Sequence, residues 1–203
     1  MNIKAILMVI MALAIMSCSG KKKRGIDFAE FKKEVTLTPE QEKNFDEITA
    51  KYKKQQEQNY EAAKAQGGQM DRVALGIKNE ELRAQQSLEM GNVLKADQLV
   101  KFNEFVEKNS RKRPRYTNEL LEKIRTEAQL TNEQFTMLNA SNDAFEKAFN
   151  DAHDIYHGNT DLAREYWSKF DVQRKEAMKT SLYPEQYEKF LELVKDQQFK
   201  GRE

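Results

Sequence analysis

The sequence predicts an all-α protein: two tandem antiparallel helical hairpins, each preceded by a short helix, in an elongated or curved arrangement. The main observation is a nine-residue phrase that occurs four times. It consists of a leucine, an acidic residue three positions on, a glutamine next and a large apolar residue four further. Valine and isoleucine are sparse, and no segment alternates as a half-buried strand would. The copies of the phrase begin at Leu37, Leu94, Leu130 and Leu182.

Two copies of the phrase have the composition of a helix start. In the first, Thr38 is a good N-cap and Pro39 falls at the first helical position, where its missing N–H costs nothing. Gln41 stands three residues after the cap and completes a capping box. The third copy repeats this arrangement with Thr131 and Gln134.

The other two copies lack a good cap. Their cap positions hold Lys95 and Tyr183, so we expect a turn or kink between helices there rather than a clean helix start. The remaining positions of these copies are Leu94, Gln98, Leu182 and Gln186.

The apolar residues and the glycines divide the chain into two helical units, residues 26–108 and residues 118–200. In each unit apolar side chains recur at a spacing of three to four residues, which is typical of amphipathic helices. A glycine break lies almost midway between the two phrases of each unit, at Gly67-Gly68 and at Gly158. We therefore expect the glycines at the tip of each hairpin and the two phrases at its base.

A basic segment, residues 109–117, separates the two units and contains Pro114. Its Arg and Lys residues could form an anion or nucleic-acid site, but a solvated linker is the favoured interpretation. The whole chain has 34 Lys and Arg against 33 Asp and Glu, with a net charge of +1. This balance argues against a nucleic-acid-binding protein, which usually carries a large field of one sign.

The first residues resemble a bacterial lipoprotein signal. Residues 1–17 hold one Lys and then an apolar run that is too short to span a membrane, and the run ends just before Cys18. The resemblance implies cleavage before Cys18 and lipidation of its thiol, in the bacterial cell envelope and on an outer- or inner-membrane protein facing the periplasm. Residues 18–25 are then a flexible tether, and its basic run 21–24 either is simply solvated or is attracted to anionic headgroups.

The first and third phrases resemble the LTxxQ motif of the Spy/CpxP family of bacterial periplasmic proteins. They read Leu37-Thr38-Pro39-Glu40-Gln41 and Leu130-Thr131-Asn132-Glu133-Gln134. The resemblance implies an all-helical protein that acts as an ATP-independent chaperone or as an envelope-stress sensor. Members of the Spy type form a dimeric cradle for unfolded clients, so the two units here are expected to mimic such a dimer within one chain. A homodimer of the whole chain is the other arrangement.

Two aromatic residues near the hairpin tips, Tyr60 and Tyr156, are the candidates for contact with a client. His153 and His157 are four residues apart and would share one face of a helix, which suggests a zinc site. A third ligand would have to come from a carboxylate such as Asp151 or Asp161. Methionines at helical spacing and Trp167 are assigned to the core, as such residues usually are.

No catalytic constellation is present in the sequence. It contains no phosphate-binding glycine loop, no nucleophile elbow and no HExxH motif, and Cys18 is assigned to lipid. We therefore expect a protein that is not an enzyme. Three functions remain: a chaperone that binds unfolded or envelope proteins, a regulatory protein responsive to envelope stress or to metal, and a structural helical lipoprotein.

Overall fold

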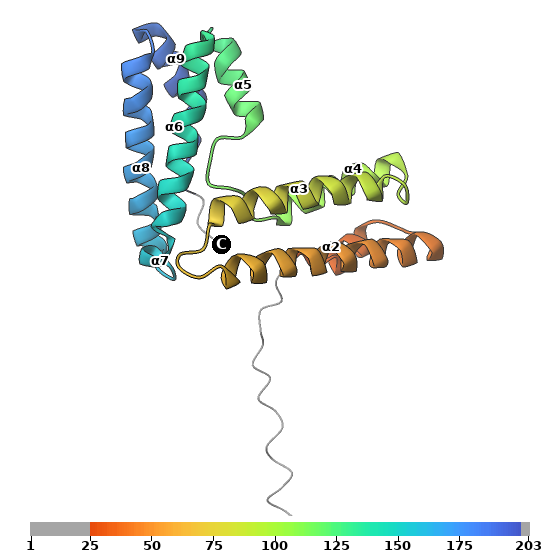
Figure 1. Cartoon of the computed structure of the whole chain (residues 1–203). Coiled ribbons are helices and arrows are strands. Elements are labelled where there is room, and N and C mark those ends of the chain that lie inside the picture. Colours follow the sequence, from red (N-terminus) through yellow and green to blue (C-terminus); the bar gives the residue numbers. More distant parts are fainter. Residues whose placement is uncertain (1–24, 200–203) are drawn as a thin grey trace, which may run out of the picture.

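The computed structural model describes residues 25–199, and within them every regular element is a helix (Figure 1). The predicted signal sequence, Cys18 and most of the predicted tether lie outside this range. The helices are α1 (Ala29–Glu34), α2 (Pro39–Ala65), α3 (Arg72–Met90), α4 (Ala96–Asn109), α5 (Asn118–Glu127), α6 (Asn132–Asp151), α7 (His153–Tyr156), α8 (Thr160–Ser181) and α9 (Pro184–Val194). None of the described helices is both long and apolar enough to cross a membrane.

Helices α2 and α3 form the first hairpin, which confirms the predicted tip and base. Gly67 and Gly68 lie at the tip with φ angles of 74° and 68°, a backbone conformation that favours glycine. At the opposite end, α1 and α4 cover the base (Figure 1). The core there is aromatic, and the ring centroids of Phe31 and Phe45 are 5.3 Å apart.

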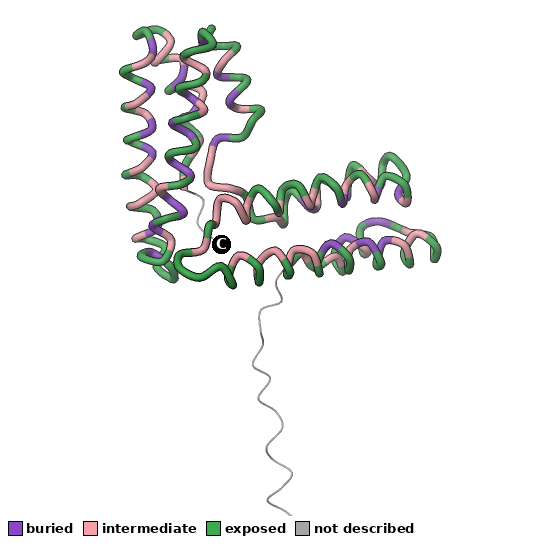
Figure 2. The backbone as a smooth tube through the Cα atoms, viewed as in Figure 1, coloured by how far each residue is buried: buried purple, intermediate pink, exposed green. Residues whose placement is uncertain are grey.

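Burial is uneven along the first hairpin. Phe45, Ile48 and Tyr52 of α2 are buried, at the spacing of three to four residues that an amphipathic helix requires. Between residues 53 and 85, however, no residue is buried, and Figure 2 shows this half of the hairpin in the colours of partly and fully exposed chain. The tip half of the first hairpin is therefore held by few apolar contacts.

Helices α6 and α8 form the second hairpin, with the short α7 at its tip. Gly158 reverses the chain there with a φ of 81°, and Asn159 caps α8 by accepting a hydrogen bond from the Leu162 N–H at 3.0 Å. Helices α5 and α9 pack at the base (Figure 1). The core of this end consists of fully buried apolar side chains from all four helices, among them Ile124, Leu138, Met178 and Phe190.

The two hairpins meet near their tips and give the molecule the outline of an L (Figure 1), with α3 packed against α6. The segment between them, residues 109–117, was predicted to be a solvated linker, and this is wrong for residues 113–116, none of which is exposed, whereas residues 109, 111, 112 and 117 are exposed. Tyr116 is 1% exposed, and Arg113 and Arg115 both pair with the carboxylate of Glu146, which is also 1% exposed. A buried carboxylate needs such partners, so the segment is drawn into the body of the protein.

A glycine makes part of this junction possible. Gly76 lies in the second turn of α3, and a Cβ at this position would stand 3.2 Å from Cγ of Arg113. The absence of a side chain lets Arg113 lie across the helix and reach both Glu146 and Glu80. The linker therefore fixes the position of one hairpin against the other.

Candidate functional site

The two phrases of the first hairpin meet at its base through their glutamines. The Gln41 side chain accepts a hydrogen bond from the Thr38 N–H at 3.0 Å and donates to Oε1 of Gln98 at 2.9 Å and to the Val93 carbonyl at 2.9 Å. Gln98 in turn accepts from the Lys95 N–H at 2.9 Å and donates to the Thr36 carbonyl at 2.9 Å.

The second hairpin has the same arrangement. Gln134 accepts from the Thr131 N–H at 2.9 Å and donates to Oε1 of Gln186 at 2.8 Å. Gln186 accepts from the Tyr183 N–H at 3.1 Å and donates to the Gln129 carbonyl at 3.1 Å. We call each of these glutamine pairs, Gln41–Gln98 and Gln134–Gln186, a glutamine clasp.

The clasps explain why the phrase occurs twice in each unit. Each glutamine stabilises the first turn of its own helix and the chain entering the partner helix, so the phrases act as structural joints. The leucines at the head of the phrases are buried or half-buried beside them, and the four are Leu37, Leu94, Leu130 and Leu182.

The turns predicted at the second and fourth copies are confirmed, but the expectation that they would replace a clean helix start is wrong, because α4 and α9 begin there. Lys95 and Tyr183 have extended backbones, with ψ of 160° and 154°, as N-cap residues do. Neither side chain can accept a hydrogen bond from the backbone as Thr does. Gln98 and Gln186 supply the other half of the capping box, and this is sufficient to start α4 and α9.

We expected the two tyrosines proposed as client contacts, Tyr60 and Tyr156, to be exposed, and neither is. Tyr156 is 7% exposed, and its hydroxyl donates to the Phe149 carbonyl at 2.9 Å. Burial raises the pKa of this hydroxyl to about 12. The prediction for Tyr156 was therefore wrong, because α7 turns its aromatic side chain inward onto Phe149 and Tyr166. Tyr60 is half-buried and lines a cleft.

The two histidines lie close together, with ring centroids 4.8 Å apart. They do not share a helical face, because α7 ends at Tyr156 and His157 already has ψ of 127°. Burial lowers the pKa of His153, whose Nδ1 is 3.2 Å from Asp154. Among residues 25–199 no group of three His, Cys, Asp or Glu side chains is placed to hold a metal ion.

The two carboxylates considered as a third zinc ligand are engaged elsewhere. Asp151 pairs with Lys147 at 2.6 Å, and Asp161 pairs with Arg164 at 3.0 Å. Asp154, beside His153, pairs instead with Arg72 of α3 at 2.8 Å, a contact between the two hairpins.

A cleft of about 690 Å³ lies along the tip half of the first hairpin. We call it the basic cleft. Its walls come from α2, from α3, from the linker and from α6, and Tyr60, Met70 and Leu75 add apolar surface. Six cationic side chains line it: Lys53, Arg72, Arg83, Arg111, Lys112 and Arg113. The carboxylates that line it are Glu57 and Glu146.

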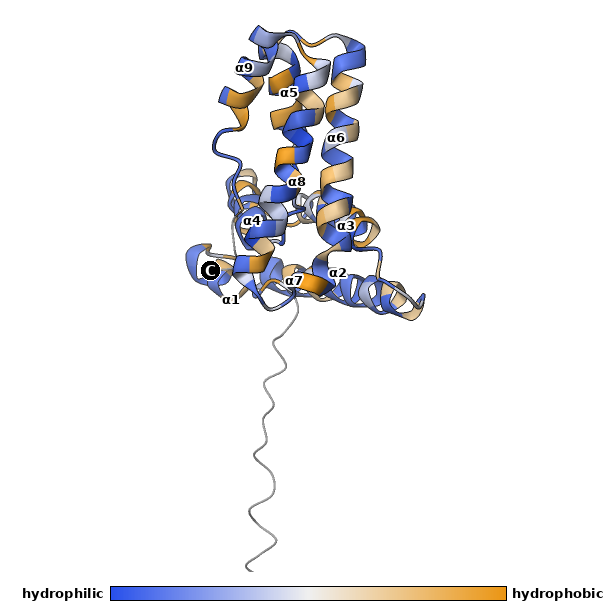
Figure 3. Cartoon of the chain, turned by 90° about the vertical axis from the view of Figure 1, so that its left-hand side faces the viewer, coloured by the Kyte–Doolittle hydropathy of each residue, from blue (hydrophilic) through white to orange (hydrophobic). Residues whose placement is uncertain are grey.

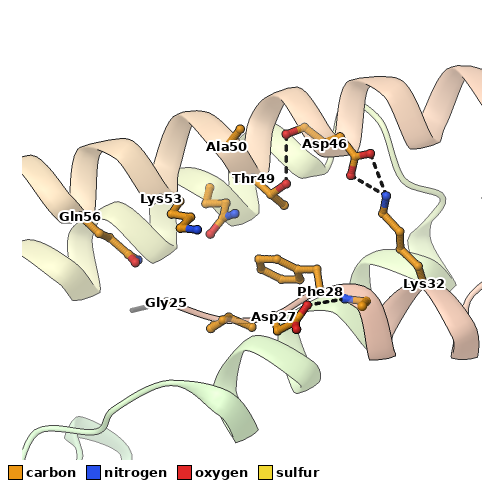
Figure 4. Close-up of a pocket in the computed structure, with 12 residues that line it drawn as sticks. Gly25, Asp27, Phe28, Lys32, Asp46, Thr49, Ala50, Lys53 and Gln56 are labelled. Atoms are coloured by element: carbon orange, nitrogen blue, oxygen red, sulfur yellow. Dashed lines mark hydrogen bonds and ion pairs between the residues drawn. The ribbon is translucent and has the colours of Figure 1, made fainter. Parts of the chain in front are cut away.

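A smaller cleft of about 390 Å³ lies on the other side of Lys53, between the start of α1 and α2 (Figure 4). Two of its polar side chains bond to Asp46: the Lys32 ammonium is 2.6 Å from a carboxylate oxygen of Asp46, and the Thr49 hydroxyl donates to the Asp46 carbonyl at 3.1 Å. Phe28 closes the floor by stacking into the aromatic core. This cleft is therefore a joint between α1 and α2.

The second hairpin holds a buried polar network that the sequence analysis did not identify. Asn142 accepts a hydrogen bond from the Tyr116 N–H at 3.0 Å and another from Arg174 at 2.9 Å, and it donates to the Tyr116 carbonyl at 3.1 Å. Arg174 lies over the Tyr116 ring, 3.5 Å from its centroid, and pairs with Asp171. Because the network is almost fully paired within the protein, it serves to fix the linker to the hairpin. Asn142 and Arg174 are polar residues, and polar residues on a helix are usually exposed. The only sequence signal of their burial was their spacing along the inner face of the hairpin.

The comparisons with known proteins add no relative: the chain matches no protein-family model, no curated protein and no solved structure.

Proposed function

We propose that this protein is a lipid-anchored, periplasmic, chaperone-like protein that binds unfolded or envelope proteins on its helical surface without ATP. The observation that carries the proposal is the glutamine clasp. The LTxxQ-type phrases, which carry the resemblance to the Spy/CpxP family, come together in pairs at the base of each hairpin.

The surface of the hairpins suits weak contacts with many partners. Hydrophobic and hydrophilic segments alternate along α6 and α8 (Figure 3). The large apolar residues that are exposed lie far apart in the sequence. Leu88 is 77% exposed and Ile155 is 62% exposed. Such a surface allows several shallow contacts with an extended chain, while the charges keep the protein itself soluble. The other exposed large apolar residues are Ile77, Val100, Met137, Val172, Tyr183 and Leu191.

An aggregation assay tests this proposal. The chain from Ser19 onward, which retains every described residue, is added without ATP to a chemically denatured model protein diluted into buffer. We expect light scattering to fall as the chain approaches an equimolar ratio. No suppression at a several-fold excess would refute the proposal and favour the structural lipoprotein.

Matched variants identify the contacting residues. A variant with Leu88, Val100, Ile155 and Val172 changed to Ser should suppress aggregation several-fold less well. A control with the exposed Gln58 and Gln66 changed to Ser should act as the parent does. Tyr60→Ala is a separate arm, and an unchanged result for it would exclude the basic cleft as a client site.

Lipidation at Cys18 has its own measurement. In a bacterial host, the mature protein should gain the mass of acyl chains, and Cys18→Ala should remain unprocessed and without them. An unmodified Cys18 in the mature chain would contradict the anchor.

A further inference from the structure

We propose that the basic cleft binds the phosphate headgroups of anionic phospholipids and so holds the first hairpin against the membrane surface. The proposal deepens the membrane attachment proposed above, since it assigns a second, protein-borne contact beside the lipid on Cys18. It does not depend on the client-binding activity.

The cleft holds cationic charge that the protein itself does not neutralise. Arg113 is paired with Glu146, and Lys112 is 2.5 Å from Glu107. Lys53 and Arg83 line the cleft but make no ion pair with another described residue. Glu57 offsets one of these charges, but six cationic side chains against two carboxylates leave the lining of the cleft positive, and a positive cleft attracts anions.

The cleft also contains buried polar atoms that lack a partner. Nε of Arg72 and Oδ1 of Asn79 are both shielded from solvent and make no hydrogen bond within the described chain. Of the two only the Arg72 N–H is a donor that an anion could satisfy, and the far end of the same guanidinium pairs with Asp154. An unpaired N–H on a guanidinium is a donor suited to a phosphate oxygen, and the Arg fork matches phosphate geometry. The cost of leaving such a group unpaired is recovered when an anion enters.

The poor packing of the surrounding hairpin fits this use. No residue between positions 53 and 85 is buried, so α2 and α3 are not sealed against each other over the cleft. Tyr60, Met70 and Leu75 supply apolar surface next to the cations. A phospholipid presents a similar order of groups, an anionic phosphate, then the glycerol esters and then apolar acyl chains.

The basic cleft lies close to the point where the tether ends. Gly25, the first described residue, lines the cleft and lies beside Lys53. Only seven peptide steps separate Gly25 from Cys18. Even fully extended they reach about 25 Å, so a lipid on Cys18 would keep the cleft close to the bilayer. A neighbouring headgroup is therefore the anion that the cleft meets at the highest local concentration.

Vesicle sedimentation tests the proposal. The chain from Ser19 is used without lipid, and Lys21, Lys22, Lys23 and Arg24 are changed to Gln in every sample so that the tether contributes no charge. This parent should bind vesicles of phosphatidylcholine with 30% phosphatidylglycerol and should not bind phosphatidylcholine alone. The cleft variant is Lys53→Gln with Arg83→Gln, and the control is Lys101→Gln with Lys108→Gln, two exposed cations of α4 outside the cleft.

The two variants remove equal charge, so their difference isolates the cleft. Each cation near an anionic surface contributes roughly fivefold to partitioning, so the cleft variant should bind about 25-fold more weakly. The control should change by less than about threefold. Circular dichroism must show equal helix content for both. Equal loss in the two variants, or no binding by the parent, would overturn the proposal.

Two soluble probes exclude other anions. If inorganic phosphate saturates the site while the parent ignores vesicles, the cleft is a free-phosphate site and the headgroup proposal is wrong. If the cleft variant loses binding to hexaglutamate but not to vesicles, the cleft takes acidic peptides and the proposal is again wrong. The aggregation assay on the same variants is a separate readout, so a failure of chaperone activity is distinguishable from a failure of headgroup binding.

Discussion

Removing the charge of Glu146 should loosen the junction between the hairpins. This carboxylate is 1% exposed and accepts hydrogen bonds from Nε of Arg113 at 2.6 Å and from Arg115 at 3.1 Å. Glu146→Gln keeps the size of the side chain but leaves two guanidinium groups facing a neutral amide.

The expected magnitude follows from the burial of the partners. Breaking a fully buried ion pair costs about 3–5 kcal/mol. Arg113 and Arg115 are 15% and 16% exposed, and each keeps a second carboxylate, Glu80 at 3.1 Å and Asp143 at 2.7 Å. We therefore expect Glu146→Gln to lower the free energy of unfolding by about 2 kcal/mol, which is below that range because both arginines keep a partner.

Urea unfolding followed by circular dichroism measures this effect. With a slope of about 2 kcal/mol per molar urea, the midpoint should fall by about 1 M. Asp143→Asn is the control, because Asp143 is 64% exposed and an exposed pair contributes at most about 1 kcal/mol. If Glu146→Gln and Asp143→Asn shift the midpoint equally, the argument that the linker fixes the hairpins is refuted.

Three further changes test other parts of the structure. Gln134→Ala and Gln186→Ala should each lower the free energy of unfolding by about 1–2 kcal/mol. The double variant should lose less than the sum of the two, because the loss of one partner already breaks the clasp. Strictly additive losses in urea unfolding would contradict the clasp. Burial lowers the pKa of His153 in the folded protein, so the unfolded chain binds a proton at this residue more readily than the folded chain does. The free energy of unfolding should therefore decrease as the pH falls through about 6.5. His153→Asn should flatten that pH dependence. An NMR titration that places the His153 pKa at or above its ordinary value would contradict this sign. Tyr156→Phe removes the hydrogen bond to the Phe149 carbonyl and should lower the thermal midpoint by an amount corresponding to about 1 kcal/mol, with no change expected if the hydroxyl faced solvent.

The hairpins were predictable because their signals are local. Helix caps at Thr38 and Thr131, tip glycines such as Gly158, and apolar spacing each act within a few residues. The glutamines were recognised as capping residues for the same reason. That Gln41 also bonds Gln98 across 57 positions follows only from the meeting of two phrases at one base.

The junction was not predictable, because its partners are distant and look ordinary in sequence. Arg113 lies in a basic run that is typical of a solvated linker, and Glu146 lies on a helix rich in polar residues. Neither residue looks buried in the sequence. Their contact depends on Gly76, whose missing side chain leaves room for Arg113 to lie across α3. Tyr156 was misplaced for a similar reason, since the turn into α7 changes which face of the chain is inside.

The proposed chaperone function depends most on the binding of unfolded proteins by this chain. The most direct measurement is fluorescence anisotropy of one labelled polypeptide in its permanently unfolded and its folded form, titrated with the chain from Ser19 without ATP. We predict saturable binding of the unfolded form and no binding of the folded form. Equal binding of both forms, or binding of neither, would contradict it.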